Sequence, residues 1–98
     1  MTLSKEEQLY KSYVVPGFSD LMVKALAEHG DRGDSWKDED EGWLLERARE
    51  ELEELAISLE KRDTKGMGYS QKQAKVIAHN AADVSNFMMM IADAVGGL

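Results

Sequence analysis

The sequence predicts an all-α protein: a helical bundle of three main helices with a short N-terminal segment, completed by oligomerisation. Three long segments repeat apolar residues every three or four positions, which is the period of an amphipathic helix. Polar stretches with glycine separate these segments, and none of the segments alternates as a β-strand does. With 98 residues we expect one domain, 1–98, whose core alone would be marginally stable.

The beginning of the chain, 1–16, is expected to hold at most a short helix. Ser4 and Glu7 have the spacing of a capping box, which starts a helix. Pro16 then interrupts the pattern, because the residue before a proline disfavours the helical region. The first main helix is expected over about 18–29, and a glycine follows it.

The second main helix is expected over about 40–62, after a polar loop. Its apolar residues alternate in steps of three and four, as they do in helices that pack in bundles. They are Leu45, Ala48, Leu52, Leu55 and Leu59.

The third and longest main helix is expected from Ser70 to about Val95. Ser70 and Gln73 form a second capping-box pair, and two glycines close the helix. The main apolar stripe comprises Ile77, Ala81, Val84, Met88, Ile91 and Val95. A second apolar side, around Ala82, exceeds what the other helices of a short chain can cover, so we expect it to meet another subunit.

The composition is acidic, with a formal net charge of −7 and no cysteine. The negative charge argues against a nucleic-acid polymer as a partner and favours a phosphate masked by Mg²⁺ as the anionic ligand. The lack of cysteine excludes disulfides and thiolate metal sites. No apolar run has the length of a membrane span, and the first residues lack a signal-peptide pattern, so we expect a cytoplasmic protein without a membrane partner.

Two groups of polar residues on the last two helices have the chemistry of a metal site. They are Glu50, Glu51 and Glu54 on the second main helix and Asn80, Asp83 and Asn86 on the third. By helical geometry Glu51 lies about 70° and Glu54 about 130° from the centre of their apolar stripe, on one side. Asn80 and Asp83 lie about 60° and 120° from theirs, also on one side. If the helices pack antiparallel these sides can meet, and carboxylate and amide oxygens are ligands for Mg²⁺ or Mn²⁺.

Each group also has a purely structural explanation. The glutamates could form a solvated face with salt bridges, which charged helices often have. The polar residues of the third helix stand among apolar neighbours, where an unpaired buried group costs about 1–3 kcal/mol. They need partners, which could be one another, a helix end or water instead of a ligand.

The order of the motifs over about 34–97 is a further observation. GWLL at 42–45 precedes EELEE at 50–54, and ADVSNF at 82–87 runs into MMMIAD at 88–93. This order resembles the MazG-like all-α nucleoside triphosphate pyrophosphohydrolases, which share E-x-x-E on one helix and E-x-x-D on a later one. The resemblance implies a homo-oligomer, dimer or tetramer, and Mg²⁺ dependence. It also implies cleavage of a (deoxy)nucleoside triphosphate to the monophosphate and pyrophosphate.

Under this resemblance Glu51 and Glu54 match the first pair of ligands, and Asp83 matches the final aspartate. Glu50 would be a further ligand or the base that activates water. Asn80 stands where the family has a glutamate, and an amide binds Mg²⁺ weakly and cannot act as a base. The alternative is therefore a catalytically reduced MazG-like protein that binds nucleotide or a protein partner without turnover. An acidic helical assembly module without a ligand is the third interpretation.

A few more residues are candidates for contacts with the substrate. Trp36 could stack on a base and Lys37 could meet a phosphate, although a loop tryptophan can equally close the end of a bundle. Lys72 and His79, on the polar side of the last helix, could contact phosphate or simply be solvated. Asn86 could orient the ligand or a metal-bound water, with hydrogen bonding between helices as the equal alternative.

Overall fold

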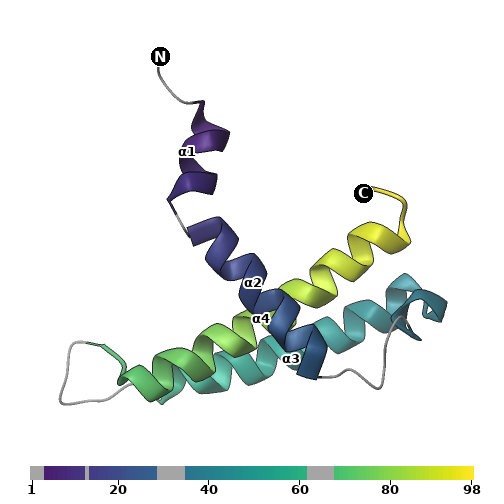
Figure 1. Ribbon diagram of the computed structural model, residues 1–98. Helices are drawn as coiled ribbons and strands as arrows, with labels where there is room; N and C mark the ends of the chain where they lie inside the picture. The colour runs from purple at the N-terminus through teal and green to yellow at the C-terminus, as the bar shows by residue number, and fades with distance from the viewer. Residues whose placement is uncertain (1–3, 13, 29–34, 62–67) are drawn as a thin grey trace.

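The computed structural model describes residues 4–12, 14–28, 35–61 and 68–98 and confirms the all-α fold (Figure 1). The elements are α1 (Lys5–Lys11), α2 (Val14–Glu28), the short 3-10 helix η2 (Ser35–Asp38), α3 (Glu41–Glu60) and α4 (Gln71–Ala94). Within these ranges there is no strand. None of the described helices is both long enough and apolar enough to cross a membrane.

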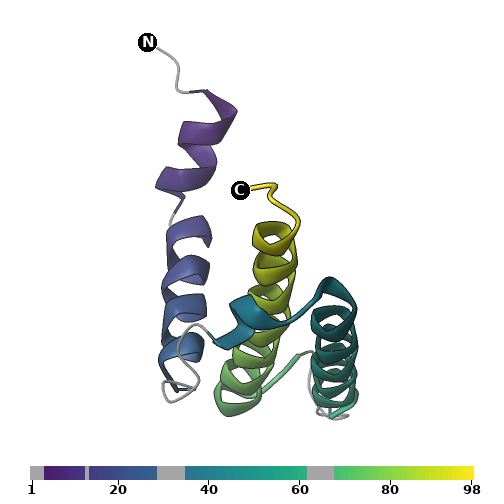
Figure 2. The same ribbon diagram turned by 90° about the vertical axis from the view of Figure 1, so that its right-hand side faces the viewer.

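The central element is α4. α3 packs antiparallel along one side of α4, and α2 packs on another side, so that α4 lies between them (Figures 1 and 2). η2 also contacts α4, whereas α1 contacts α2 and projects away from the other helices (Figure 2). The molecule is thinnest in one direction, with extents of 45 × 44 × 22 Å, because α1 and α2 run across the direction of α3 and α4 (Figure 1).

The second helix of the chain, α2, begins at Val14, so the prediction that Pro16 interrupts helical structure is wrong. Pro16 is the third residue of α2 and lies in its first turn. Backbone N–H groups in a first turn have no acceptor within the helix, so proline loses no hydrogen bond there. The short helix α1 has the expected cap, since the Ser4 hydroxyl accepts from the backbone N–H of Glu7 at 3.1 Å.

Both ends of α4 form as the sequence predicts. The Ser70 hydroxyl accepts from the Gln73 N–H at 3.1 Å, and the Gln73 side chain accepts from the Ser70 N–H at 2.9 Å, which completes a capping box. At the other end Gly96 has a φ of 79°. The N–H of Gly97 then donates to the carbonyl of Ala92 at 2.9 Å, and this bond closes the helix.

Two side chains near the start of α4 hold the end of α3. The Tyr69 hydroxyl donates to the carbonyl of Leu59 at 3.0 Å, and the Gln73 amide donates to the carbonyl of Lys61 at 2.8 Å. Carbonyl groups in the last turn of a helix lack N–H donors within it, so these bonds satisfy them. They also place the start of α4 beside the end of α3, which sets the register of the pair.

The face that α3 turns toward α4 differs from the expected stripe. Leu44, Ala48 and Ser58 are buried, whereas three residues expected in the stripe are about half exposed: Leu45, Leu52 and Leu59. The packed face is therefore rotated by roughly 60° around the helix. The apolar residues alone predicted the wrong centre for the packed face of α3, because a polar residue can also be buried once it has a hydrogen-bond partner. The Ser58 hydroxyl, for example, donates to the carbonyl of Leu55 at 2.7 Å.

Few apolar side chains of the described residues are buried. They are Ala25, Leu44, Ala48, Ala82 and Met90. Ala82 shares a side of α4 with His79 and Asn86, both of which bond to α2. Within the chain, α2 thus covers the side of α4 around Ala82 that we expected another subunit to meet. The core remains small for a chain of 98 residues, and Leu44 is its largest fully buried side chain.

Candidate functional site

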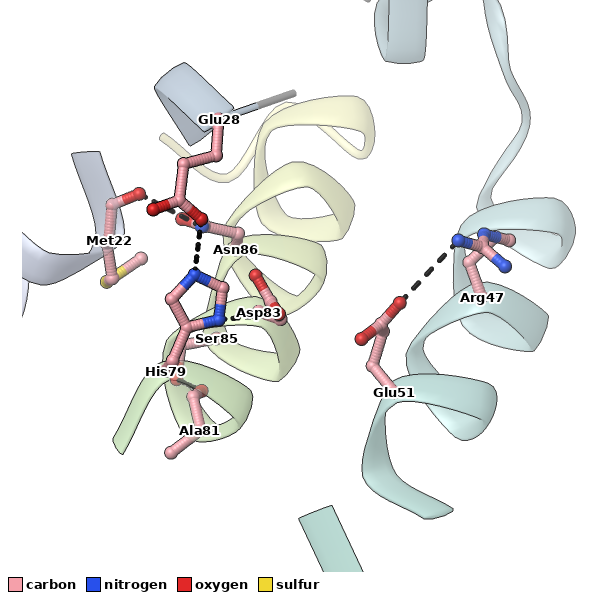
Figure 3. Close-up of polar contacts among 9 residues, drawn as sticks. All are labelled: Met22, Glu28, Arg47, Glu51, His79, Ala81, Asp83, Ser85 and Asn86. Atoms are coloured by element: carbon pink, nitrogen blue, oxygen red, sulfur yellow. Dashed lines mark hydrogen bonds and ion pairs between the residues drawn. The ribbon is translucent and has the colours of Figure 1, made fainter. Parts of the chain in front are cut away.

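The rotated packing of α3 brings Glu51 toward α4, where it faces Asp83 (Figure 3). The two side chains are only 13% and 14% exposed. Glu54, about one turn further along α3, lies close enough to Glu51 to act on its charge. Glu51 therefore lies within electrostatic range of both Glu54 and Asp83. We call Glu51, Glu54 and Asp83 the carboxylate cluster.

The electrostatics of the carboxylate cluster are unfavourable for three negative charges. The pKa of Glu51 is raised above the usual value, first because burial disfavours the ionised form and then because Glu54 and Asp83 repel its charge. The hydrogen bond that a protonated Glu51 can share with Glu54 raises the pKa further, whereas the Arg47 guanidinium lowers it. A cation bound between these side chains would relieve both the burial of charge and the repulsion.

Arg47 is the positively charged neighbour of the carboxylate cluster. It forms ion pairs with Glu50 and, at 3.6 Å, with Glu51. Its guanidinium also lies over the ring of Phe87 on α4, 5.7 Å from the ring centre. Arg47 thus reaches from α3 to α4 at one end of the cluster, which is a position where an anionic group bound to the cluster would meet a positive charge.

His79 joins the cluster to α2. Its Nε2 lies 2.7 Å from Glu28 Oε2 on α2, and its Nδ1 lies 3.3 Å from Asp83 Oδ2 (Figure 3). The hydrogen bond with Glu28 is the largest cause that raises the pKa of His79; burial opposes it, and the charge of Asp83 adds to it. The sequence analysis missed Glu28 altogether. The residue lies 51 positions before His79, and no local pattern marks so distant a partner.

Asn86 lies on the α2 side of α4 and is 3% exposed. Its Nδ2 donates to the carbonyl of Met22 at 3.1 Å (Figure 3), so the interhelical hydrogen bond that the sequence left open is present. The Oδ1 atom of Asn86 is buried without a hydrogen-bond partner among the described residues. No described contact connects Asn86 with the carboxylate cluster, so its expected role at the substrate stays a prediction.

The remaining candidates lie at the edge of the cluster or outside it. Glu50 is 61% exposed and forms an ion pair with Arg47. Asn80 is half-buried on α4, one turn before Asp83. Three more predicted contacts with the substrate complete the set: Lys37 and Lys72 are exposed, and the side chain of Trp36 lies outside the described part of the structure.

The donor set of the cluster fits Mg²⁺ by chemistry, since it consists of carboxylate oxygens with an amide close by. In the part of the chain that the structure describes, no three histidine, aspartate or glutamate side chains already converge closely enough to hold a metal ion. The raised pKa of Glu51 means that a positive charge nearby would stabilise its ionised form. The residues that could bind such a cation are Glu51, Glu54 and Asp83, with Asn80 one turn away.

Comparison of the chain with protein-family models, curated proteins and solved structures finds no match.

Proposed function

We propose that the protein is a Mg²⁺-dependent nucleoside triphosphate pyrophosphohydrolase of the MazG-like type, acting as a cytoplasmic homo-oligomer. The observation that supports this proposal best is the pair of Glu51 and Asp83, whose half-buried side chains face each other between α3 and α4 beside Glu54. Two acids on a solvated surface would explain the sequence motifs equally well, but solvated acids would not be 13% and 14% exposed. The resemblance of the motif order supplies the reaction.

Phosphoryl chemistry depends on positioning and on neutralising charge more than on a covalent nucleophile. When bound, Mg²⁺ would supply the neutralising charge and polarise the phosphate. Glu54 and Asp83 would hold the ion, and Glu51 would share this role. A carboxylate of this group that does not bind the ion, Glu50 or Glu51, would accept the proton of an attacking water. Arg47 would meet negative charge on the substrate from the α3 side.

The test is release of pyrophosphate from a panel of ribo- and deoxyribonucleoside triphosphates with and without Mg²⁺. We expect release with Mg²⁺ from at least one nucleotide, and a loss of about 100-fold or more in Glu51→Gln, since the change removes a charge that acts at the reacting centre. Glu53→Gln is the matched control, because Glu53 is exposed on α3. Equal activity in Glu51→Gln and Glu53→Gln would contradict the proposed site.

One observation favours a second candidate, a reduced relative that binds nucleotide without turnover. Asn80 is half-buried one turn from Asp83, where an amide leaves the cluster one carboxylate short of the family pattern. Calorimetric titration with a non-hydrolysable triphosphate and Mg²⁺ separates the candidates, because binding without pyrophosphate release supports the second. In that case Asn80→Glu should produce turnover, and an enzyme that is already active should change little.

A further inference from the structure

A row of exposed leucines runs along α3. Leu45, Leu52 and Leu59 are 42%, 53% and 43% exposed, although each is a large apolar residue. Their spacing of seven residues places them two turns apart on nearly the same side of the helix. Inside the chain α3 packs on α4 through Leu44 and Ala48, so the leucine row lies beside that contact and not in it.

The neighbouring helix α4 has a matching pair of exposed apolar residues. Met88 and Val95 are 45% and 61% exposed and are also seven residues apart. In an antiparallel pair, residues rotated in the same sense from the contact line lie on the same side of the pair. This geometry places Met88 and Val95 on the side that carries the leucine row. We call Leu45, Leu52, Leu59, Met88 and Val95 the leucine face.

The leucine face and the carboxylate cluster lie on opposite sides of the α3–α4 pair. Arg47 lies over Phe87, and Glu51 interacts with Asp83, so these contacts mark the acidic side of the pair. Each of these residues is rotated from the contact line in the sense opposite to the leucine row. α2 is bonded to α4 through His79, which also contacts Asp83, so α2 sits toward the acidic side and leaves the leucine face uncovered.

The accessible surface of the chain is larger than that of a compact monomer of the same mass. A folded monomer of 11.0 kDa has an accessible surface of about 5,600 Å². This chain has 7636 Å², an excess of about 2,000 Å² over that expectation. Permanent dimers bury about 1,000–2,500 Å² on each subunit. The projecting helix α1, with exposed Leu9 and Tyr10, accounts for part of the excess and would gain cover from the same association.

We propose that the leucine face is the surface through which two copies of this chain associate, so that two α3–α4 pairs form a four-helix bundle. The occupant must be present whenever the chain is folded, because only five apolar residues of the described ranges are buried without it, and the largest fully buried one is Leu44. A second copy satisfies this condition. A twofold axis sets each leucine row against its counterpart, and the spacing of seven suits helices that pack at a shallow angle.

The arrangement leaves both carboxylate clusters on the outer sides of the bundle. Each subunit would then keep a complete cluster of its own, without residues from its partner. This inference concerns assembly and does not rest on the proposed activity, although it identifies the face that serves the expected homo-oligomer. A dimer without pyrophosphate release would refute the function alone, and an active monomer would refute the interface alone.

The experiment measures the mass of the full chain by sedimentation at micromolar concentration, for the natural sequence and for Leu52→Glu. We expect a particle of at least twice 11.0 kDa for the natural sequence. We expect the dimer dissociation constant of Leu52→Glu to rise by more than about 100-fold, since the charge enters the interface twice. A folded natural chain of 11.0 kDa would overturn the proposal and leave the face to a different protein.

Cross-linking keeps the test valid if Leu52→Glu does not fold. The chain has no cysteine, so single cysteines can be placed without background. With a short bis-maleimide, Leu52→Cys should give covalent dimers at nanomolar protein, and Val23→Cys, at an exposed position of α2, should stay monomeric. Equal yields from the two variants, or dimers from Val23→Cys alone, would refute this face as the interface.

Discussion

Replacing Glu51 by glutamine should have opposite consequences with and without Mg²⁺. Glutamine has nearly the same shape as glutamate but no charge. In the folded protein, burial and the charges of Glu54 and Asp83 disfavour ionised Glu51, and Arg47 compensates only in part. Without a cation, ionised Glu51 therefore lowers the free energy of unfolding at neutral pH, and glutamine removes this unfavourable contribution.

The sign follows from the direction of the pKa shift. Because the pKa of Glu51 is raised above 4.5 on folding, the free energy of unfolding falls as the pH rises through the raised pKa and stays lower above it. At pH 7.5 Glu51→Gln should therefore be more stable in EDTA, by on the order of 1 kcal/mol. For a chain of this length that corresponds to a Tm higher by about 4–8 °C.

In Mg²⁺ the difference in stability between Glu51→Gln and the natural chain should disappear or change sign. A ligand present at ten times its dissociation constant stabilises the folded state by about 1.4 kcal/mol, and the variant should lose most of that gain. The assay is thermal unfolding followed by circular dichroism, at one protein concentration, in EDTA and in 10 mM Mg²⁺. Exposed Glu53→Gln is the control and should shift little in either buffer. A Glu51→Gln variant that is less stable in EDTA, or that gains as much from Mg²⁺ as the natural chain, would refute this reasoning.

Two further predictions concern the contacts of α2 with α4. The pKa of His79 is raised above 6.5, chiefly by its hydrogen bond with Glu28 and also by Asp83, so the stability it adds is complete below pH 6.5 and is lost as the pH rises through the raised value. Urea unfolding from pH 6 to 9 should show that loss in the natural chain and a flatter profile in His79→Gln; identical profiles would contradict it. Asn86→Ala should lower the free energy of unfolding by about 1–3 kcal/mol, because it removes the bond to the Met22 carbonyl and leaves a small void. An unchanged urea midpoint would show that this bond contributes nothing.

The sequence predicted the features that depend on neighbouring residues. The capping box of Ser70 and Gln73 predicted the start of α4, because its two hydrogen bonds join residues three positions apart. The position of Pro16 was misjudged for an equally local reason. A proline stops a helix that precedes it but is accepted in the first turn of one that starts there, and the sequence allows either.

Features that depend on distant residues were predicted only in outline. The motif spacing placed Glu51 and Asp83 on sides that could meet, and the structure brings them together. It did not reveal that α3 is rotated so far that the leucine row becomes exposed. That rotation depends on which side chains of α4 pack against α3, and the sequence of α3 alone does not contain this information. Glu28 was missed for the same reason, since its partner His79 lies on another helix.

The central position of α4 has a consequence for how the chain folds during synthesis. α2 and α3 both pack on α4, yet both precede it in the sequence and leave the ribosome first. Until α4 emerges, the sides of α2 and α3 that pack on it have no partner, and helices in proteins draw most of their stability from such packing. We therefore expect this domain to fold only after α4 has been synthesised. Until then α2 and α3 are targets for chaperones that bind exposed apolar segments.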